Sequence, residues 1–320
     1  MKNIYDKDSL ELIRENIKNV NANYIFICIL LLITYFVLQG IYMKSILKAL
    51  NYDISVKKGI FYSLIEFYFS GITPSSTGGQ PVQLYYMTKD KIPIRKSYIT
   101  LMLNTIYFKL IILIFGILVL LVNNTYVFDG PIIYRVCFFL GFLVDFIIVL
   151  LGFFLLFKTS LIEFLYEKLT SFLRKFKIFK KKFKADNNEV MERYKDEIHF
   201  IKNHKMLVFI TFVITFIQRL ALFSIIYVIY KALGYSGYSY LDLLIIQLSV
   251  QTAIEALPLP GGAGLSESML HNIFTVIFSV EMADVGMLLT RTFTFYVPLL
   301  ASGLIILTQY ILSKRKKNNN

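Results

Sequence analysis

Two short segments rich in proline and glycine interrupt strongly apolar stretches of this chain. Residues 73–81 read Thr-Pro-Ser-Ser-Thr-Gly-Gly-Gln-Pro, and residues 258–264 read Pro-Leu-Pro-Gly-Gly-Ala-Gly. Irregular backbone at the depth of a bilayer persists only where protein or a wet cavity satisfies its N–H and C=O groups. Two such breaks in corresponding halves of a chain therefore indicate a binding site.

The composition places the rest of the chain in a membrane. Of 320 residues, 56% are apolar and 17% are charged, and the mean hydropathy is +0.61. A helix needs about 20 apolar residues to cross the hydrocarbon core of a bilayer. We therefore expect an all-α polytopic membrane protein with about five full spans. The expected spans cover residues 24–43, 98–122, 132–157, 206–230 and 286–312, and two further apolar regions, 59–87 and 241–280, carry the breaks.

The distribution of lysine and arginine predicts which loops are cytoplasmic. These residues are frequent in segment 158–205 and in the C-terminal tail, whereas loops 123–131 and 232–240 contain none. Because cytoplasmic loops carry the excess of positive charge, we expect a multi-pass protein of the cell membrane with the basic segment and the C-terminus inside. This topology also explains the net charge of +13 without nucleic-acid binding.

The same charges predict how the two broken regions enter the membrane. Region 59–87 lies between basic loops and should begin and end inside, whereas region 241–280 should begin and end outside. Each then forms a re-entrant helical hairpin, and the two halves form an inverted repeat. The alternative is a cytoplasmic N-terminus with region 59–87 crossing once. We expect a single membrane domain made of a first half-repeat (about 24–122), a linking span (132–157), a basic cytoplasmic segment (158–205), a second half-repeat (about 206–312) and a basic tail (313–320).

Polar residues surround both breaks. Gln247, Gln251 and Glu255 are spaced four apart, which places them on one helical face before the second break. A helix that restarts after a break presents orphan N–H groups with partial positive charge, which suit a phosphate or carboxylate. The structural alternative is that both breaks are kinks whose glycines permit close helix packing.

Several charged side chains lie inside the expected spans, where each should face a partner or a cavity. Lys109 and Asp145 lie on consecutive spans and are expected to pair. Arg219 and Arg291 have acidic candidates in Glu255 and Glu267, and an anionic head group is the other possible partner for these arginines.

The basic segment 158–205 alternates cations with aromatic and aliphatic residues. Such a pattern suits a helix lying on an anionic leaflet, and an ordinary basic loop is the alternative. Independent signs of catalysis are few, because the three histidines show no metal-ligand spacing and no nucleotide-binding loop follows a strand. We therefore expect no cofactor and no metal.

The residues around the two breaks resemble a known family. Residues 72–83 (Ile-Thr-Pro-Ser-Ser-Thr-Gly-Gly-Gln-Pro-Val-Gln) and 256–267 (Ala-Leu-Pro-Leu-Pro-Gly-Gly-Ala-Gly-Leu-Ser-Glu) look like the flippase-like membrane domain of lysylphosphatidylglycerol synthases, the multiple peptide resistance factors. In full-length synthases this domain is similar to a translocator of aminoacylated phosphatidylglycerol, and a separate soluble domain transfers lysine from lysyl-tRNA. The chain stops at Asn320 after its last span, so we expect a stand-alone form without the transferase domain.

The resemblance implies a lipid translocator for an anionic or aminoacylated phospholipid, or another phosphate-bearing lipid. The enzymatic alternative, by family inheritance, is a phosphatidylglycerol lysyltransferase that confers resistance to cationic antimicrobial peptides. Expected partners are the lipid, an anionic leaflet contacted by segment 158–205, and a second copy of the chain in a homo-oligomer. In this hypothesis the glycines admit the phosphate, the arginines neutralise it, and Glu255 and Glu267 bind a cationic head group or carry a proton. The expected substrate-binding residues are Pro74, Gly78, Gly79, Gln80, Gln83, Arg219, Gln251, Glu255, Pro258, Pro260, Gly261, Gly262, Gly264, Glu267 and Arg291.

Overall fold

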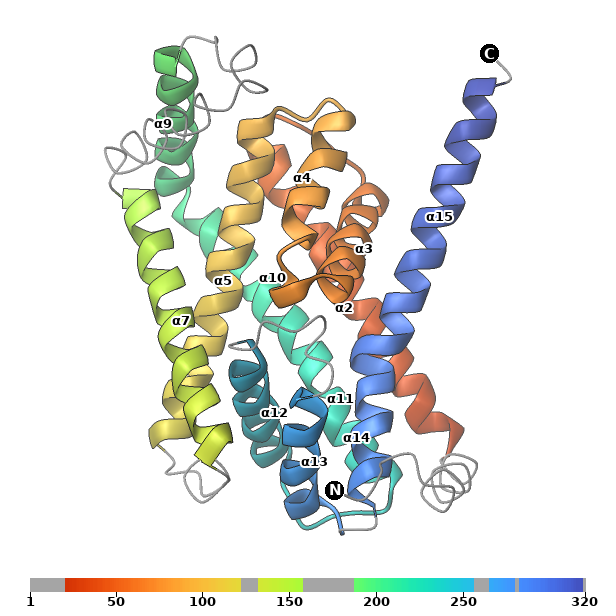
Figure 1. The fold of residues 1–320 in the computed structure, drawn as a ribbon. Helices are drawn as coiled ribbons and strands as arrows, with labels where there is room; N and C mark the ends of the chain where they lie inside the picture. Colours follow the sequence, from red (N-terminus) through yellow and green to blue (C-terminus); the bar gives the residue numbers. More distant parts are fainter. Residues whose placement is uncertain (1–20, 122–131, 158–186, 256–264, 280–281, 319–320) are drawn as a thin grey trace.

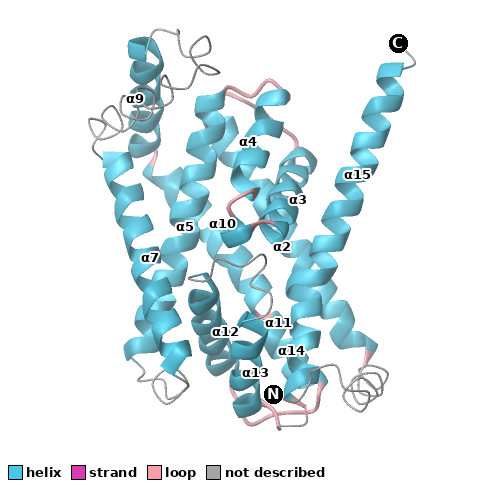
Figure 2. Ribbon diagram, in the orientation of Figure 1, coloured by secondary structure: helices cyan, strands magenta, loops and turns pink. Residues whose placement is uncertain are grey.

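The computed structural model describes residues 21–121, 132–157, 187–255, 265–279 and 282–318. Within these ranges every regular element is helical and no strand is present (Figure 2). Five helical stretches are long and apolar enough to cross a membrane, which confirms the expected all-α membrane fold. These stretches are α2 (Ala22–Ala49), α5 (Ile94–Leu121), α7 (Ile132–Phe157), α10 (Lys205–Phe223) with α11 (Ile225–Ala232), and α14 (Ala283–Arg291) with η3 (Thr292–Tyr296) and α15 (Val297–Asn318).

The two broken regions form shorter helices. The first hairpin consists of α3 (Val56–Ile72), the short turn η1 (Pro74–Ser76) and α4 (Gly79–Lys89). The second hairpin consists of α12 (Tyr240–Glu255) and α13 (Leu265–Ile277). In Figure 1 the first hairpin occupies the upper half of the molecule, and the second hairpin occupies the lower half.

Hydrogen bonds and an ion pair join the outer ends of each hairpin. Lys58 Nζ, near the start of α3, lies 2.6 Å from the Asp90 carboxylate that follows α4. The Tyr238 hydroxyl, just before α12, donates to the carbonyl of Val276 near the end of α13, at 3.3 Å. The two outer ends of each hairpin therefore lie close together. That the hairpins are re-entrant in the membrane stays a prediction. The inverted-repeat relation between the halves stays a prediction.

Basic side chains gather at one end of the molecule, which we call the basic end and define by Lys48, Lys58, Lys89, Lys96 and Lys314. The outer ends of α3 and α4, the start of α5 and the C-terminal end of α15 lie there, at the top of Figure 1. This arrangement agrees with the loop charges, although the assignment of this end to the cytoplasm stays a prediction.

Part of the expected basic segment 158–205 is a helix, α9 (Asn187–Asn203), and residues 158–186 lie outside the described part of the chain. Ile198 and Ile201 are buried and join the same hydrophobic cluster as residues of α2 and α5. Burial raises the pKa of the Glu197 carboxyl, while Arg95 and Lys96 act to lower it. The described helix α9 thus packs on the transmembrane bundle, and the expected contact of segment 158–205 with an anionic leaflet stays a prediction.

Glycines let α3 pack tightly between two long helices. A Cβ on Gly59 would lie 2.6 Å from the carbonyl oxygen of Gly40 in α2. On the other side, a Cβ on Gly71 would lie 2.7 Å from Leu299 Cδ1, and one on Gly303 would lie 2.7 Å from the Tyr68 ring. Without a hydrophobic drive between helices in lipid, such close backbone contact supplies much of the packing energy.

The expected pairing of Lys109 with Asp145 is confirmed. Lys109 Nζ in α5 lies 2.8 Å from Asp145 Oδ1 in α7, and the Asp145 side chain has no exposed surface. The pair fixes the rotation of α7 against α5, because each charge needs the other inside the membrane.

Replacing Gly59 with alanine should destabilise the protein by about 1–3 kcal/mol, because the new methyl group meets backbone that cannot move aside. The measurement is the free energy of unfolding in mixed micelles. Gly237→Ala is the matched control, since its Cβ would meet no atom closer than 3.5 Å. Equal stability of Gly59→Ala and wild type would show that α2 and α3 pack less closely than described.

Lys109→Met should cost about 3–5 kcal/mol of stability, because it leaves a buried carboxylate without its cation. The double variant Lys109→Met, Asp145→Leu should recover most of that loss, since it removes both charges. The same unfolding measurement on both variants decides the point. A double variant as unstable as the single one would mean that the ion pair does not join these helices.

Candidate functional site

The first break is built by Pro74. A proline disfavours helical backbone in the residue before it, and Thr73 is extended, with φ −112° and ψ 147°, so α3 ends at Ile72. The Thr73 hydroxyl donates to the carbonyl of Phe69 at 2.6 Å and accepts from the N–H of Gly78 at 2.9 Å. Ser76 adopts left-handed backbone with φ 54°, after which the chain restarts as α4. The turn is therefore satisfied largely by its own residues.

The two glycines of this break are required by contact with α3. A Cβ on Gly79 would lie 2.6 Å from the carbonyl oxygen of Glu66 and would overlap the Ser70 hydroxyl. A Cβ on Gly78 would lie 2.5 Å from the Thr73 methyl carbon. Close packing against the preceding residues therefore explains both glycines, and the expectation that they admit a phosphate stays a prediction.

Arg219 and Glu66 form a charged centre between four helices. Arg219 Nη1 in α10 donates to the Tyr35 hydroxyl in α2 at 3.2 Å, and the guanidinium lies 3.9 Å from the ring centroid of Phe108 in α5. Glu66 in α3 accepts a hydrogen bond from Ser70 at 3.3 Å and lies within electrostatic reach of Arg219. Both charged side chains are half-buried.

Most hydrogen-bonding capacity of Arg219 is unused. A guanidinium has five N–H donors, and Tyr35 is its one hydrogen-bond partner among the described residues. The Nε group is buried without a partner, and the described chain places no carboxylate in direct ion-pair contact with this arginine. A cation with free donors and an offset carboxylate suits a ligand that carries phosphate.

Arg291 lies on a distorted part of the last span. It immediately precedes the π-helical turn η3, which Pro298 explains, since a proline inside a helix removes a hydrogen bond and crowds the preceding turn. The guanidinium of Arg291 lies 4.9 Å from the Phe295 ring centroid, and that ring also borders Gly71. The Phe295 ring therefore lies beside both Arg291 and the end of α3.

The other expected site residues in the described part of the chain differ in burial and in the helices that they contact. The side-chain amide of Gln80 donates to Thr105 Oγ1 in α5. Gln83 is 1% exposed and donates to Met43 Sδ at 3.5 Å, so it belongs to the packed core. Pro74 is exposed at the turn, and Gln251 is half-buried on α12.

The second break and its acidic residues fall outside the described part of the chain. This applies to Pro258, Pro260, Gly261, Gly262 and Gly264, and to the side chains of Glu255 and Glu267. Among the described residues, the acid near Arg219 is Glu66, which was absent from the expected site. The signal that could have found it is its isolation, because it is the one charged residue in the apolar run 59–72.

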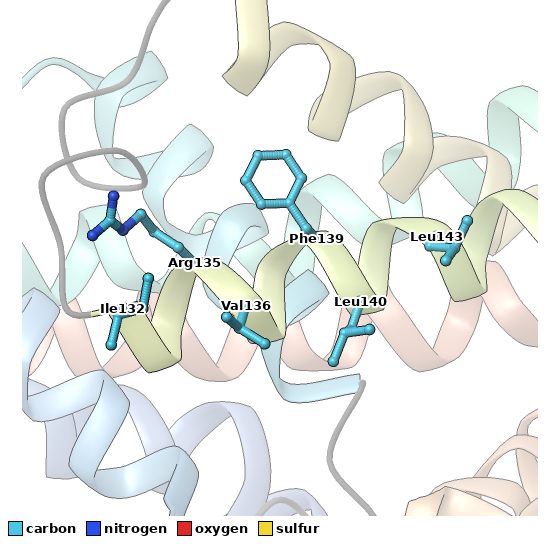
Figure 3. Close-up of a pocket in the computed structure, with 6 residues that line it drawn as sticks. All are labelled: Ile132, Arg135, Val136, Phe139, Leu140 and Leu143. Carbon is cyan, nitrogen blue, oxygen red and sulfur yellow. The ribbon is translucent and has the colours of Figure 1, made fainter.

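A shallow groove of about 460 Å³ runs along α7. Figure 3 shows Arg135 and Phe139 on one side of the helix and Val136 and Leu140 on another, with Ile132 and Leu143 completing the lining. Apart from Arg135, the lining is apolar and largely exposed, as expected for a lipid-facing surface. The groove contains none of the expected site residues.

Comparison with known proteins agrees with this membrane architecture. A family model described as "Lysylphosphatidylglycerol synthase TM region" matches residues 5–302. The chain belongs to this family. The chain is also similar to a "UPF0104 membrane protein" of Archaeoglobus fulgidus. The two sequences are 25% identical over 325 aligned positions, which cover 98% of this chain and 95% of the relative. No solved structure matches the chain. Membership of the synthase TM-region family fits a membrane function related to lipids.

In this family member, Gly79→Ala should loosen the first hairpin, because the added methyl group overlaps Ser70 and the α3 backbone. We expect amide hydrogen exchange in residues 66–89 to become about tenfold faster, with exchange in α5 unchanged. Gln80→Ala is the control at the neighbouring position, since it removes a hydrogen bond without adding atoms. Unchanged exchange in Gly79→Ala would contradict the packing role of this glycine.

Proposed function

We propose that this protein moves a phosphate-bearing lipid, such as an anionic or aminoacylated phospholipid, between the two leaflets of the membrane. The observation that carries the proposal is Arg219, a half-buried cation with unused donors inside a transmembrane helix. A charge at this depth is costly, and such residues in membrane proteins mark substrate or ion pathways.

The depth of Arg219 supports a site near the middle of the bilayer. With a rise of about 1.5 Å per residue, Arg219 lies roughly 21 Å along the axis from the start of α10, at a point where a hydrocarbon core of about 30 Å has no bulk head groups. A lipid phosphate that reaches this arginine has left the plane of its own leaflet. Contact with Arg219 would therefore help the lipid cross the membrane, because it stabilises the charged head group at a depth where the surrounding lipid tails cannot.

The planar guanidinium suits phosphate better than a point charge does. Two parallel N–H groups of arginine can bond two phosphate oxygens, whereas lysine offers a single ammonium. The rings of Phe108 and Tyr35 hold the guanidinium in place, with its carbon 3.9 Å and 5.5 Å from their centroids. The side chain is thus oriented before a ligand arrives.

Arg219→Ala should slow movement of fluorescent phosphatidylglycerol between leaflets of proteoliposomes by about tenfold or more, the loss expected for one charge-assisted hydrogen bond at a desolvated site. Arg219→Lys should recover part of the rate, because it keeps the charge and loses the paired donors. Lys231→Ala is the matched control, since this half-buried cation contacts the Tyr227 ring, 5.6 Å away. A wild-type rate in Arg219→Ala would reject the assigned role.

The name of the family favours one other function, transfer of lysine to phosphatidylglycerol. This reaction makes a separate demand, because the purified chain supplied with lysyl-tRNA and phosphatidylglycerol must form lysylated lipid. Product formation in that assay, together with an absence of lipid movement between leaflets, would replace the translocator proposal.

A further inference from the structure

A column of buried polar side chains runs through the interface of α2, α5 and α10. We call it the polar seam. Its members are at most 7% exposed, although they lie inside transmembrane helices. They repeat at three- and four-residue intervals, which places them on one face of each helix. The seam consists of Ser97, Thr100 and Asn104 in α5, Thr211, Thr215 and Gln218 in α10, and Gln39 in α2.

Tyrosine hydroxyls show that the seam faces of the three helices meet. The Tyr42 hydroxyl in α2 donates to the carbonyl of Thr100 in α5 at 2.8 Å. The Tyr107 hydroxyl in α5 donates to the carbonyl of Val208 in α10 at 3.2 Å. Arg219 closes the circle by its bond to Tyr35 in α2. The polar residues therefore line one shared interface.

The seam contains polar atoms that no described protein group satisfies. The threonine hydroxyls bond carbonyls of their own helices, for example Thr215 to Thr211 at 2.9 Å. In contrast, Ser97 Oγ, Asn104 Oδ1, Gln39 Oε1 and both amide atoms of Gln218 are buried without a hydrogen-bond partner. Each such atom costs about 1–3 kcal/mol if left unsatisfied, and buried polar groups of this kind are ordinarily satisfied by internal water.

The seam leads from the basic end to the charged centre. At about 1.5 Å per residue, Ser97 lies roughly 5 Å along α5 from its start, and Asn104 lies roughly 15 Å along it. Gln39 lies roughly 15 Å from the end of α2, and Gln218 lies roughly 20 Å from the start of α10, next to Arg219. Glu66 lies roughly 15 Å from the start of α3. The ends of α2, α3 and α5 used for these distances are at the basic end, whereas α10 begins below α9, nearer the middle of the molecule (Figure 1).

We propose that the polar seam is a hydrated path through which Glu66 exchanges protons with the basic end, and that Glu66 takes up one proton when a lipid phosphate engages Arg219. The coupling in this inference rests on the proposed lipid translocation. The proton passes from bulk water along the seam to the Glu66 carboxylate and forms the neutral acid. It leaves by the reverse step when the phosphate departs.

The charges around Glu66 give the coupling its direction. Among the described groups, the titratable and charged side chains that act on Glu66 are Arg219 from α10 and Tyr35 from α2, and Ser70 on its own helix donates a hydrogen bond to it. Ionised Glu66 partly neutralises Arg219 and repels an approaching phosphate. Protonation removes that repulsion and leaves the full arginine charge for the lipid. Proton and phosphate therefore bind together, and acidification strengthens lipid binding.

Cysteine labelling tests the hydrated path independently of any lipid. In a background with Cys28 and Cys137 replaced by alanine, Asn104→Cys should react with a membrane-impermeant thiol reagent added at the basic end. Leu103→Cys is the matched control, because Leu103 is on the same helix, 1% exposed and packed in an apolar cluster. We expect Asn104→Cys to react at least about tenfold faster than Leu103→Cys, because the reactive thiolate forms where water reaches the side chain. Equally slow reaction at both positions would overturn the path.

Proton uptake tests the coupling. Phosphatidylglycerol is added to the purified protein in weakly buffered detergent with a pH indicator, while native mass spectrometry counts bound lipid. Wild type should take up about one proton per bound lipid at a pH where Glu66 is ionised, and Glu66→Gln should take up none. Glu66→Asp should recover uptake, because it keeps an acid.

The outcomes separate the two proposals. Lipid binding by wild type without proton uptake, or equal uptake by wild type and Glu66→Gln, would overturn the coupling and leave translocation standing. Failure of wild type to bind phosphatidylglycerol or lysylated phosphatidylglycerol would count against the proposed function and the coupling together. The labelling result would then still decide whether the seam is hydrated.

Discussion

A charged arginine held within the hydrocarbon layer is the constraint on which this structure depends. Arg219 cannot face lipid tails, so α2, α3 and α5 must surround it with a tyrosine hydroxyl, a carboxylate and an aromatic ring. These contacts fix the rotation of α10 and place Glu66 at the same depth. The ion pair of Lys109 with Asp145 applies the same constraint to α5 and α7. Charges that would otherwise prevent insertion therefore define how the helices face one another.

The first broken hairpin brings an acidic residue, Glu66, to the charged centre. Because Pro74 ends α3 at Ile72, the chain turns back there, and Glu66 lies about two helical turns before Pro74. Close glycine contacts hold α3 against α2 on one side and α15 on the other. The acid is thus carried on a tightly packed element, while the donors of Arg219 stay unused. In the proposed function, this rigid frame around incompletely satisfied polar groups is what would bind a charged head group within the bilayer.

Much of the architecture could be predicted from the sequence, and much of the site could not. Hydropathy located the five spans, Pro74 located the first break, and the pairing of Lys109 with Asp145 followed from two charges on consecutive helices. The sequence did not indicate Glu66 as an acid near Arg219, because the approach of α3 to α10 depends on a packing arrangement that periodicity along one helix does not contain. The expected partners Glu255 and Glu267 stay predictions, because their side chains lie outside the described residues. Gln83, whose place in the site stays a prediction, contacts Met43 in the core, and periodicity along one helix does not contain this contact between helices. The role of Gly79 depends on its nearness to Ser70, which lies before the break in α3, and only the three-dimensional turn brings the two residues together.

The most direct test of the account is a structure of the protein by electron cryo-microscopy in nanodiscs that contain phosphatidylglycerol. The account predicts lipid phosphate density within hydrogen-bonding distance of the Arg219 guanidinium, with Glu66 beside it and outside direct contact with the arginine. A direct ion pair between Glu66 and Arg219 in that structure, with no lipid head group between the hairpins, would contradict it.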